Sequence, residues 1–233
     1  REFDILMKRF TLAVTFTFVS LFTTLVTSLT TADTLKDDFK DARLTKELWE
    51  VKKGDWKIED GWWESNSPAV GQGSFVLFSD IETHDGLSMK VKCRDKGGGW
   101  SNCYTIFAYV DDDEVYYAGA RIGRGNWTIE KSALAGGEQN FGQVADGRVK
   151  AGGVIIFYTV SIEGKDVVIY GEKGKEVNRH SFGKMPIGRI GLAHENTITQ
   201  YDDFEAEGPK VKGLSVQPLR KLAVSWARIK KRL

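Results

Sequence analysis

The chain has 233 residues, with 33 Lys and Arg against 32 Asp and Glu and a formal net charge of +1. This balance argues against a protein that binds nucleic acid over its whole surface, and the length allows one large β domain. The 25 Gly and only four Pro are typical of a β protein with many turns.

The first 32 residues have the three-part layout of an export signal. Residues 1–6 do not join the pattern, which begins at Met7 with Lys8 and Arg9. An uncharged stretch over 10–29 follows, and the small residues at 30–32 offer a cleavage site. We therefore predict a signal helix and a protein that is secreted, periplasmic or at the cell surface. An uncleaved membrane anchor is the alternative, because the uncharged stretch is long enough to span a bilayer.

Two matched segments lie at the ends of the region that follows. The first comprises 35–39, Leu-Lys-Asp-Asp-Phe, with Gly-Asp-Trp-Lys-Ile-Glu-Asp-Gly at 54–61. The second comprises Gly-Arg-Ile-Gly-Leu at 188–192 and Tyr-Asp-Asp-Phe-Glu-Ala-Glu-Gly at 201–208. First and last strands of similar pattern predict a sheet in which the two ends of the domain pair, which leaves few open edges.

These segments resemble the concanavalin A-like lectin/glucanase jelly roll. Within it, they are similar to the laminin-G-like and family-16-glucanase-like domains of bacterial secreted proteins, near the 3-keto-disaccharide hydrolase-like group. The resemblance implies an all-β, two-sheet antiparallel jelly-roll sandwich over 33–208. It does not imply one function, because this fold carries lectins, hydrolases and adhesive modules.

The middle of the chain consists of short strand patterns separated by Gly and Asp turns. We expect strands at 75–78, 87–92, 104–110, 114–122, 126–130, 153–163, 166–170, 187–193 and 197–205. Residues 132–152 are rich in Gly and polar side chains, which predicts a connecting loop with at most one short strand. No helical periodicity occurs between 35 and 208, so no helix is expected there.

Two cysteines, Cys93 and Cys103, flank a glycine-rich stretch. If the strands on either side form a hairpin, the two sulfurs meet, and export to an oxidising compartment favours a disulfide. Two buried free thiols are the alternative. A zinc site is not expected, because no second Cys or His pair has ligand spacing.

Catalytic motifs are missing. The resemblance implies, for the glucanases, a Glu-x-Asp-x-x-Glu arrangement that places two carboxylates on one strand face, and this chain lacks it. The acidic stretch 111–114 reads as a turn, with cation binding as its alternative. His84, His180 and His194 are scattered without metal spacing. The missing motifs favour a protein that is not an enzyme. If the protein does catalyse a reaction, we expect it to be a glycoside hydrolase.

Residues suited to sugars are better represented, since aromatic faces stack on sugar rings and charged side chains bond the hydroxyls. Tyr117 and Arg121 share one face of a strand, and Trp100 stands in the glycine-rich loop. Packing in the core is the alternative for each tyrosine. The candidate ligand-binding residues are Trp100, Tyr104, Tyr109, Tyr117, Arg121 and Trp127.

No cofactor is required by these patterns, but a structural calcium is one interpretation of the acidic pairs near the two ends. Asp38 and Asp203 belong to strands that should be neighbours, and related jelly rolls often hold one calcium with carboxylate and backbone oxygens. A solvated strand edge is the other interpretation.

A basic tail follows Gly208 and Pro209. Residues 210–233 contain eight Lys or Arg and no acid, and from Pro218 the apolar residues have helical spacing. A basic amphipathic helix suits a membrane surface or an acidic partner. Docking of its apolar side on the sandwich is the alternative.

Together these patterns predict an exported, non-catalytic carbohydrate-binding module. A glycoside hydrolase-like enzyme with an atypical carboxylate pair is the first alternative, and an adhesive module with a protein partner is the second.

Overall fold

The computed structural model describes residues 33–67, 73–96, 101–132, 138–195 and 197–212. The predicted signal helix, Trp100 and the predicted amphipathic helix lie outside these residues. Among the described residues, no helix has both the length and the apolar character needed to cross a membrane.

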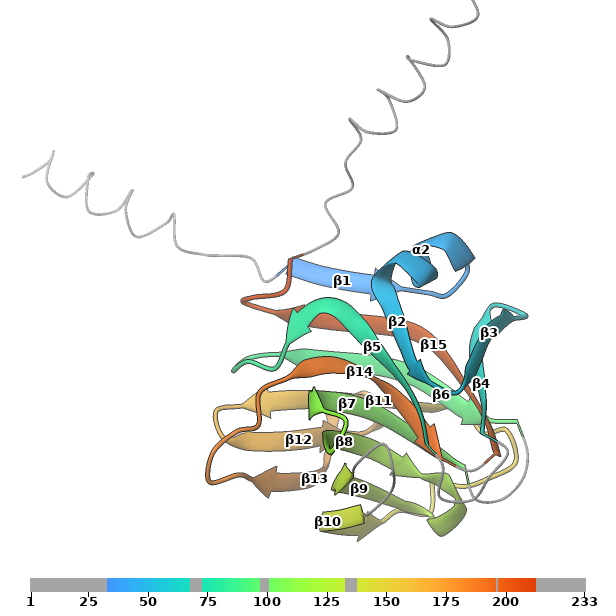
Figure 1. Cartoon of the computed structure of the whole chain (residues 1–233). Helices are drawn as coiled ribbons and strands as arrows, with labels where there is room; N and C mark the ends of the chain where they lie inside the picture. Colours follow the sequence, from blue (N-terminus) through green and yellow to red (C-terminus); the bar gives the residue numbers. More distant parts are fainter. Residues whose placement is uncertain (1–32, 68–72, 97–100, 133–137, 196, 213–233) are drawn as a thin grey trace, which may run out of the picture. The chain divides into compact units, whose positions relative to one another are not determined.

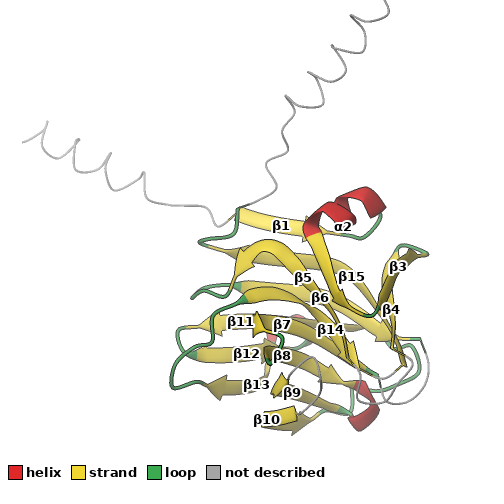
Figure 2. Cartoon of the chain, viewed as in Figure 1, coloured by secondary structure: helices red, strands yellow, loops and turns green. Residues whose placement is uncertain are grey.

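Two antiparallel sheets form a sandwich (Figures 1 and 2). Sheet A has eight strands: β1 (Asp33–Asp37), β3 (Asp55–Glu59), β4 (Trp62–Ser67), β6 (Ser88–Asp95), β11 (Ile156–Glu163), β12 (Asp166–Tyr170), β13 (Glu176–Ser181) and β15 (Thr197–Gly208). Sheet B has seven strands: β2 (Trp49–Lys53), β5 (Gly73–Glu82), β7 (Asn102–Asp111), β8 (Glu114–Arg121), β9 (Asn126–Ser132), β10 (Glu138–Ala145) and β14 (Arg189–Glu195). The all-β sandwich predicted from the sequence is confirmed.

The two ends of the domain pair in sheet A. Strand β1 runs antiparallel to β15, with Leu35 opposite Ala206 and Asp37 opposite Phe204, and Figure 1 shows the two strands side by side. The β15 strand also pairs with β4 and β6, so the last strand lies in the middle of its sheet. The predicted pairing of the end segments is confirmed.

The core between the sheets holds one large apolar cluster. At one end of it the rings of Phe39, Trp49, Trp63, Phe78 and Phe204 meet, with centroid separations of 4.9–6.3 Å between contacting rings. Edge and tilted contacts of this kind add stabilisation beyond the burial of apolar area. Period-two alternation explains the arrangement, because Trp63 points inward while its neighbour Trp62 points to the other face of sheet A.

One helix is present that the sequence pattern did not predict. The α2 helix (Ala42–Leu48) begins after Asp41, whose carboxylate accepts hydrogen bonds from the backbone N–H groups of Arg43 and Leu44. Seven residues give two turns, too few for the apolar periodicity on which the expectation of no helix rested. That expectation is wrong here.

The region 132–152 contains strand β10 (Glu138–Ala145), which pairs with β9 and forms the edge of sheet B. The remaining helical elements are the short 3-10 turns η1 (Ile122–Arg124) and η2 (Glu172–Gly174). Strands β11, β12 and β13 form two successive hairpins, and β11 and β12 lie within the expected strands 153–163 and 166–170.

The strands that carry Cys93 and Cys103 do not form a hairpin. Cys93 lies on β6 in sheet A and Cys103 on β7 in sheet B, and both thiols are free and buried. The predicted hairpin is therefore wrong, because the connection between β6 and β7 crosses from one sheet to the other. The disulfide itself stays a prediction.

Candidate functional site

The outer face of sheet B, which is the face turned away from sheet A, carries a second group of large side chains. Alternation along β7 and β8 sends Tyr104, Ile106, Val115 and Tyr117 to this face, while Cys103 and Ala118 point into the sandwich. The rings of Tyr104 and Tyr117 have centroids 4.6 Å apart. These rings form an apolar floor on the outer face.

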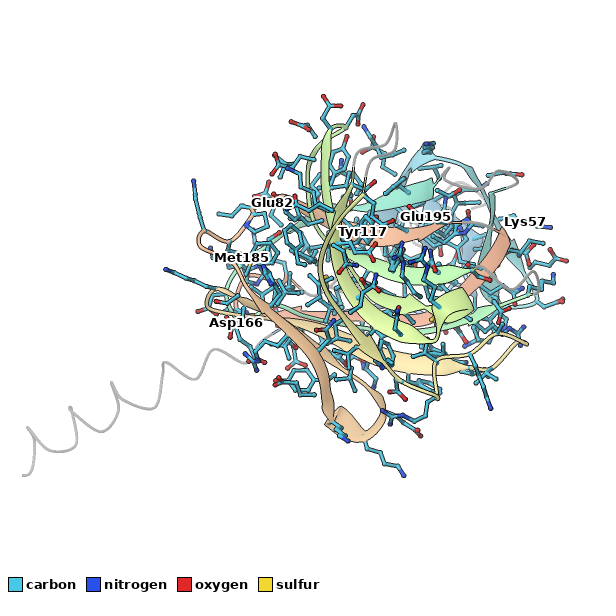
Figure 3. All side chains as sticks on the ribbon, turned by 90° about the horizontal axis from the view of Figure 1, so that it is seen from below. Lys57, Glu82, Tyr117, Asp166, Met185 and Glu195 are labelled. Atoms are coloured by element: carbon cyan, nitrogen blue, oxygen red, sulfur yellow. The ribbon has the colours of Figure 1, made fainter. Side chains whose placement is uncertain are left out.

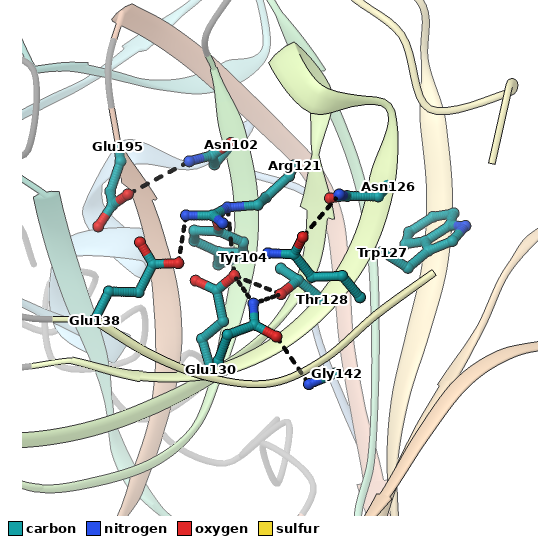
Figure 4. A network of polar contacts seen from close by, with 12 residues as sticks. Asn102, Tyr104, Arg121, Asn126, Trp127, Thr128, Glu130, Glu138, Gly142 and Glu195 are labelled. Atoms are coloured by element: carbon teal, nitrogen blue, oxygen red, sulfur yellow. Dashed lines mark hydrogen bonds and ion pairs between the residues drawn. The ribbon is translucent and has the colours of Figure 1, made fainter. Parts of the chain in front are cut away.

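A polar cluster lies beside this floor (Figure 4). We define it as Asn102, Tyr104, Arg121, Glu130, Glu138 and Glu195, which come from five neighbouring strands of sheet B. The pairing register explains the meeting, because Asn102 is opposite Arg121 and Tyr117 is opposite Glu130. In Figure 3 Tyr117 and Glu195 lie over the central strands, whereas Asp166 of sheet A lies apart from them.

Arg121 is the centre of the polar cluster. Its Nη2 lies 2.5 Å from Glu138 Oε1, and its Nε lies 3.3 Å from Glu130 Oε1 and donates to Tyr104 Oη at 3.2 Å. The Arg121 residue is 6% exposed. Although burial opposes its charge, Tyr104, Glu130 and Glu138 hold the pKa of Arg121 above its usual range. One cation therefore serves two carboxylates directly.

Glu130 is the most perturbed acid of the cluster. It is fully buried, and its Oε1 accepts hydrogen bonds from Thr128 and, at 2.9 Å, from Asn140 Nδ2. Burial is the largest cause that raises the pKa of Glu130 to about 7, and Glu138 adds to it against the opposing effects of Thr128 and Arg121. A carboxyl group with this pKa holds a proton for part of the time at neutral pH.

Glu195 completes the acidic side of the cluster. Its Oε2 accepts a hydrogen bond from Asn102 Nδ2 at 3.4 Å, and burial, followed by the charge of Glu138, raises its pKa. The positive charge of Lys53 also acts to lower the pKa of Glu195. Three carboxyl groups thus face two cations, Arg121 and Lys53, so the site carries an excess of acid. Excess buried acid without matching cations costs stability and is often found where a protein binds or reacts with a ligand.

The sequence-predicted site residues fall into three places. Tyr104, Tyr117 and Arg121 lie together on the outer face of sheet B, but both rings are at most 1% exposed and support the site from below. Tyr109 lies at the far end of β7, where its hydroxyl donates to Asp112 and burial raises its pKa to about 12. Trp127 packs inside the sandwich and donates to Asp146 Oδ2 at 2.9 Å.

The sequence reading missed the three glutamates. Glu130 and Thr128 lie on the same face of β9, but only the pairing of β8 with β9 places Glu130 beside Arg121. Glu138 belongs to the region 132–152, which was expected to be a connecting loop with at most one short strand, and Glu195 lies just beyond the predicted strand 187–193. The sequence shows which residues of one strand share a face, but it does not show which residues of the neighbouring strand lie opposite them.

The proposed calcium residues pair with lysines. Asp38 Oδ2 lies 3.0 Å from Lys40 Nζ, and Asp203 Oδ2 lies 3.5 Å from Lys92 Nζ, which also binds Asp202 Oδ2 at 2.6 Å. Among the residues that the structure describes, no group of three or more His, Cys, Asp or Glu could hold a metal ion. Both aspartates thus pair with lysine ammonium groups, and a calcium ion at Asp38 and Asp203 stays a prediction.

The three histidines are not members of the polar cluster. His194 is buried inside the sandwich with its Nε2 2.9 Å from Ser65 Oγ, and burial lowers its pKa to about 3. His180 stacks against Phe141 on the edge strand β13, and His84 lies 2.7 Å from the Glu82 carbonyl oxygen.

Comparison with known proteins gives structural neighbours only. The sequence matches no protein family and no curated protein. Carbohydrate-binding module CBM66 from Bacillus subtilis superposes with a TM-score of 0.58 at 15% identity, covering 69% of this chain and 95% of that one. The Bacillus licheniformis beta-glucanase gives 0.56 at 10% identity, covering 75% and 97%.

A third neighbour, the Crh5 transglycosylase, gives a TM-score of 0.54 at 14% identity over 77% of this chain and 86% of that one. Identities this low establish the fold and leave the function open. The described part of the chain therefore shares the antiparallel jelly-roll sandwich fold of these neighbours.

Proposed function

We propose that this protein is a non-catalytic carbohydrate-binding module whose ligand lies over the polar cluster of sheet B. The observation that carries the proposal is the convergence of three carboxyl groups and one guanidinium on a sheet face. Carboxylates accept hydrogen bonds from sugar hydroxyls and the guanidinium donates them, so both halves of each hydroxyl can be satisfied. Structural neighbours that include a carbohydrate-binding module support this choice.

The charge of the cluster restricts the ligand. Glu138 and Glu195 add negative charge at the rim, and Glu138 is the most accessible of the three acids, with 35% of its side chain exposed. An acidic rim repels uronic, sialic and sulfated sugars and accepts neutral or amino sugars. We therefore place neutral and amino-sugar polysaccharides, outside the cytoplasm, as the ligand class.

Glycan binding by the full chain tests this function. We expect Glu138→Gln to weaken binding to the best neutral or amino-sugar ligand about 10-fold, which corresponds to about 1.4 kcal/mol, as measured by calorimetry. The matched control is Glu205→Gln, a partly exposed acid that pairs with Lys36 at 2.8 Å on sheet A. An array on which no polysaccharide binds rejects carbohydrate recognition. Equal losses in both variants reject the site.

One observation favours a second function, glycoside hydrolysis. The raised pKa of Glu130 suits a general acid, and Glu138 shares Arg121 with it, so a proton donor and a carboxylate are neighbours. The family-16 arrangement on one strand is absent, so this function ranks second. Release of reducing sugar that disappears in Glu130→Gln with retained glycan binding is the result that would promote it.

A further inference from the structure

The two cysteines meet in the interior of the sandwich. Cys93 and Cys103 are each 0% exposed and belong to the same core cluster, although they lie on strands of opposite sheets. Cys93 is opposite Tyr201 on one neighbouring strand and Ile156 on the other. The hydroxyls of Tyr201 and Tyr158, on the two strands beside Cys93, both reach the backbone at Cys103: Tyr201 Oη accepts from Tyr104 N and Tyr158 Oη donates to the Cys103 carbonyl oxygen, so the two cysteines face each other across the core.

The hydroxyl groups nearest to these cysteines are already hydrogen-bonded to the backbone. Tyr158 Oη donates to the Cys103 carbonyl oxygen at 3.2 Å, and Tyr201 Oη accepts from Tyr104 N at 3.1 Å, so both phenols nearby are occupied. Burial is the main cause that raises the pKa of Cys103, which keeps it a thiol and a poor nucleophile. No metal-binding group of His, Cys, Asp or Glu exists in the described part of the chain.

We propose that Cys93 and Cys103 form a disulfide that joins sheet A to sheet B beneath the polar cluster, and that this bond forms while the chain folds. The oxidant is a small disulfide such as oxidised glutathione. One cysteine thiolate attacks it to give a mixed disulfide and one reduced glutathione, and the second cysteine thiolate then displaces the other glutathione. Two cysteine thiols are oxidised, and one glutathione disulfide is reduced to two thiols that take up the two protons.

The timing follows from the burial. An oxidant cannot reach a side chain that is 0% exposed, and a raised pKa leaves little thiolate to attack it. Exchange is therefore confined to the unfolded or partly folded chain. The redox conditions during folding then decide whether the mature domain carries the bond.

The position of the bond ties it to the candidate site. Cys103 stands between Asn102 and Tyr104, and both of these neighbours point to the outer face as members of the polar cluster. A covalent link at Cys103 fixes this part of β7 against sheet A. The bond would hold two cluster residues in place from the opposite side of the sheet.

Refolding of the full chain tests the bond. We compare refolding from denaturant in a glutathione redox buffer with refolding in dithiothreitol, and count thiols after denaturation. The expected result is no free thiol in the first sample and two in the second, with a Cys93–Cys103 peptide found by mass spectrometry. The oxidised domain should melt about 5–10 °C higher. Two free thiols after oxidative refolding, or glutathione adducts in place of the internal bond, would overturn the proposal.

A second arm tests the timing. The chain folded in dithiothreitol is moved into oxidised glutathione, with and without urea. We expect the folded sample to keep two thiols for hours and the unfolded sample to lose them, while rapid oxidation of the folded sample would overturn the timing. Cys93→Ala and Cys103→Ala are the controls, since neither should show a melting temperature that depends on the refolding buffer.

Discussion

The outer face of each sheet carries a buried glutamate, but the pKa values of these two glutamates are shifted in opposite directions. On sheet A, Glu64 accepts from Lys96 Nζ at 2.9 Å and from Gln200 Nε2 at 2.8 Å. Burial works to raise the pKa of Glu64, but these two bonds hold it below its usual range. On sheet B, the pKa of Glu130 is raised to about 7 although Arg121 is beside it.

The difference is one of charge balance. Around Glu64 the charges balance: Lys57 and Lys96 each contact both Glu64 and Glu59, so two lysines face two acids. On sheet B three acids face two cations, Arg121 and Lys53, and Arg121 contacts two of these acids directly. A balanced face is what structure alone requires, whereas an unbalanced face needs a further reason, and a ligand that supplies hydrogen-bond donors is such a reason. The comparison therefore favours sheet B over sheet A as the binding face.

The strongest test of this comparison removes the arginine that contacts Glu130 and Glu138. We expect Arg121→Met to lower the free energy of unfolding at pH 7 by about 3–5 kcal/mol, because buried acids lose their partner. At pH 5 the loss should be smaller, since Glu130 is then protonated. Urea unfolding at both pH values measures this.

The matched control for Arg121→Met is Arg94→Met on sheet A. Arg94 donates to Gln200 Oε1 at 2.7 Å and lies 4.1 Å from the centre of the Trp62 ring, with no carboxylate dependent on it in these contacts. Its loss should be about 1 kcal/mol or less and should not change with pH. A loss in Arg121→Met that is equal at both pH values would mean that Arg121 contributes packing alone.

A second test compares two glutamates whose pKa values are shifted in opposite directions. The pKa of Glu130 is higher in the folded chain, about 7, than its ordinary value of 4.5. Between these values the folded state binds more protons than the unfolded state, so the free energy of unfolding falls as pH rises. Glu130→Gln should remove this fall and stabilise the protein at pH 8 by on the order of 3 kcal/mol, with no gain near pH 4.

Glu64→Gln should have the opposite sign. The pKa of Glu64 is lowered, so its contribution is present above about pH 4.5 and is lost as pH falls through the folded value. The variant should therefore be less stable than the parent at neutral pH and converge with it in acid. Unfolding curves across pH 3–8 measure both variants, and the same sign in both would end the distinction between the two faces.

The sequence predicted the architecture better than the site because the two depend on different information. Pairing of the end segments and the hairpins of β11, β12 and β13 follow from local alternation and turn residues. The same alternation placed Tyr117 and Arg121 on one face. Which residues lie across from them depends on the register of β8 with β9, which alternation within one strand does not fix.

Two further misses have the same origin. Cys93 and Cys103 flank a short connection, which suggested a hairpin, yet consecutive strands in this sandwich also cross between sheets. The exposure of Tyr104 and Tyr117 likewise depends on neighbouring strands, so their aromatic character indicated the correct face but not that their rings are buried in it. Long-range pairing decides these properties.

The smallest expected effect comes from Lys92→Met on sheet A. Lys92 Nζ lies 2.6 Å from Asp202 Oδ2 and 4.6 Å from the centre of the Trp62 ring, and the hydrogen bond with Asp202 raises the pKa of Lys92. Because Lys92 keeps 19% of its side chain exposed, water screens the pair. We expect a loss of about 1 kcal/mol that shrinks with added salt.

Lys92→Met also tests where the ligand lies. The substitution removes a charge next to the Trp62 ring on the outer face of sheet A. A charged group beside an aromatic ring is a combination that can bind sugars. Calorimetry should give the same glycan affinity as the parent, in contrast to the roughly 10-fold loss expected for Glu138→Gln. If Lys92→Met weakens binding as much as Glu138→Gln does, charge balance does not separate the two faces, and the ligand contacts sheet A.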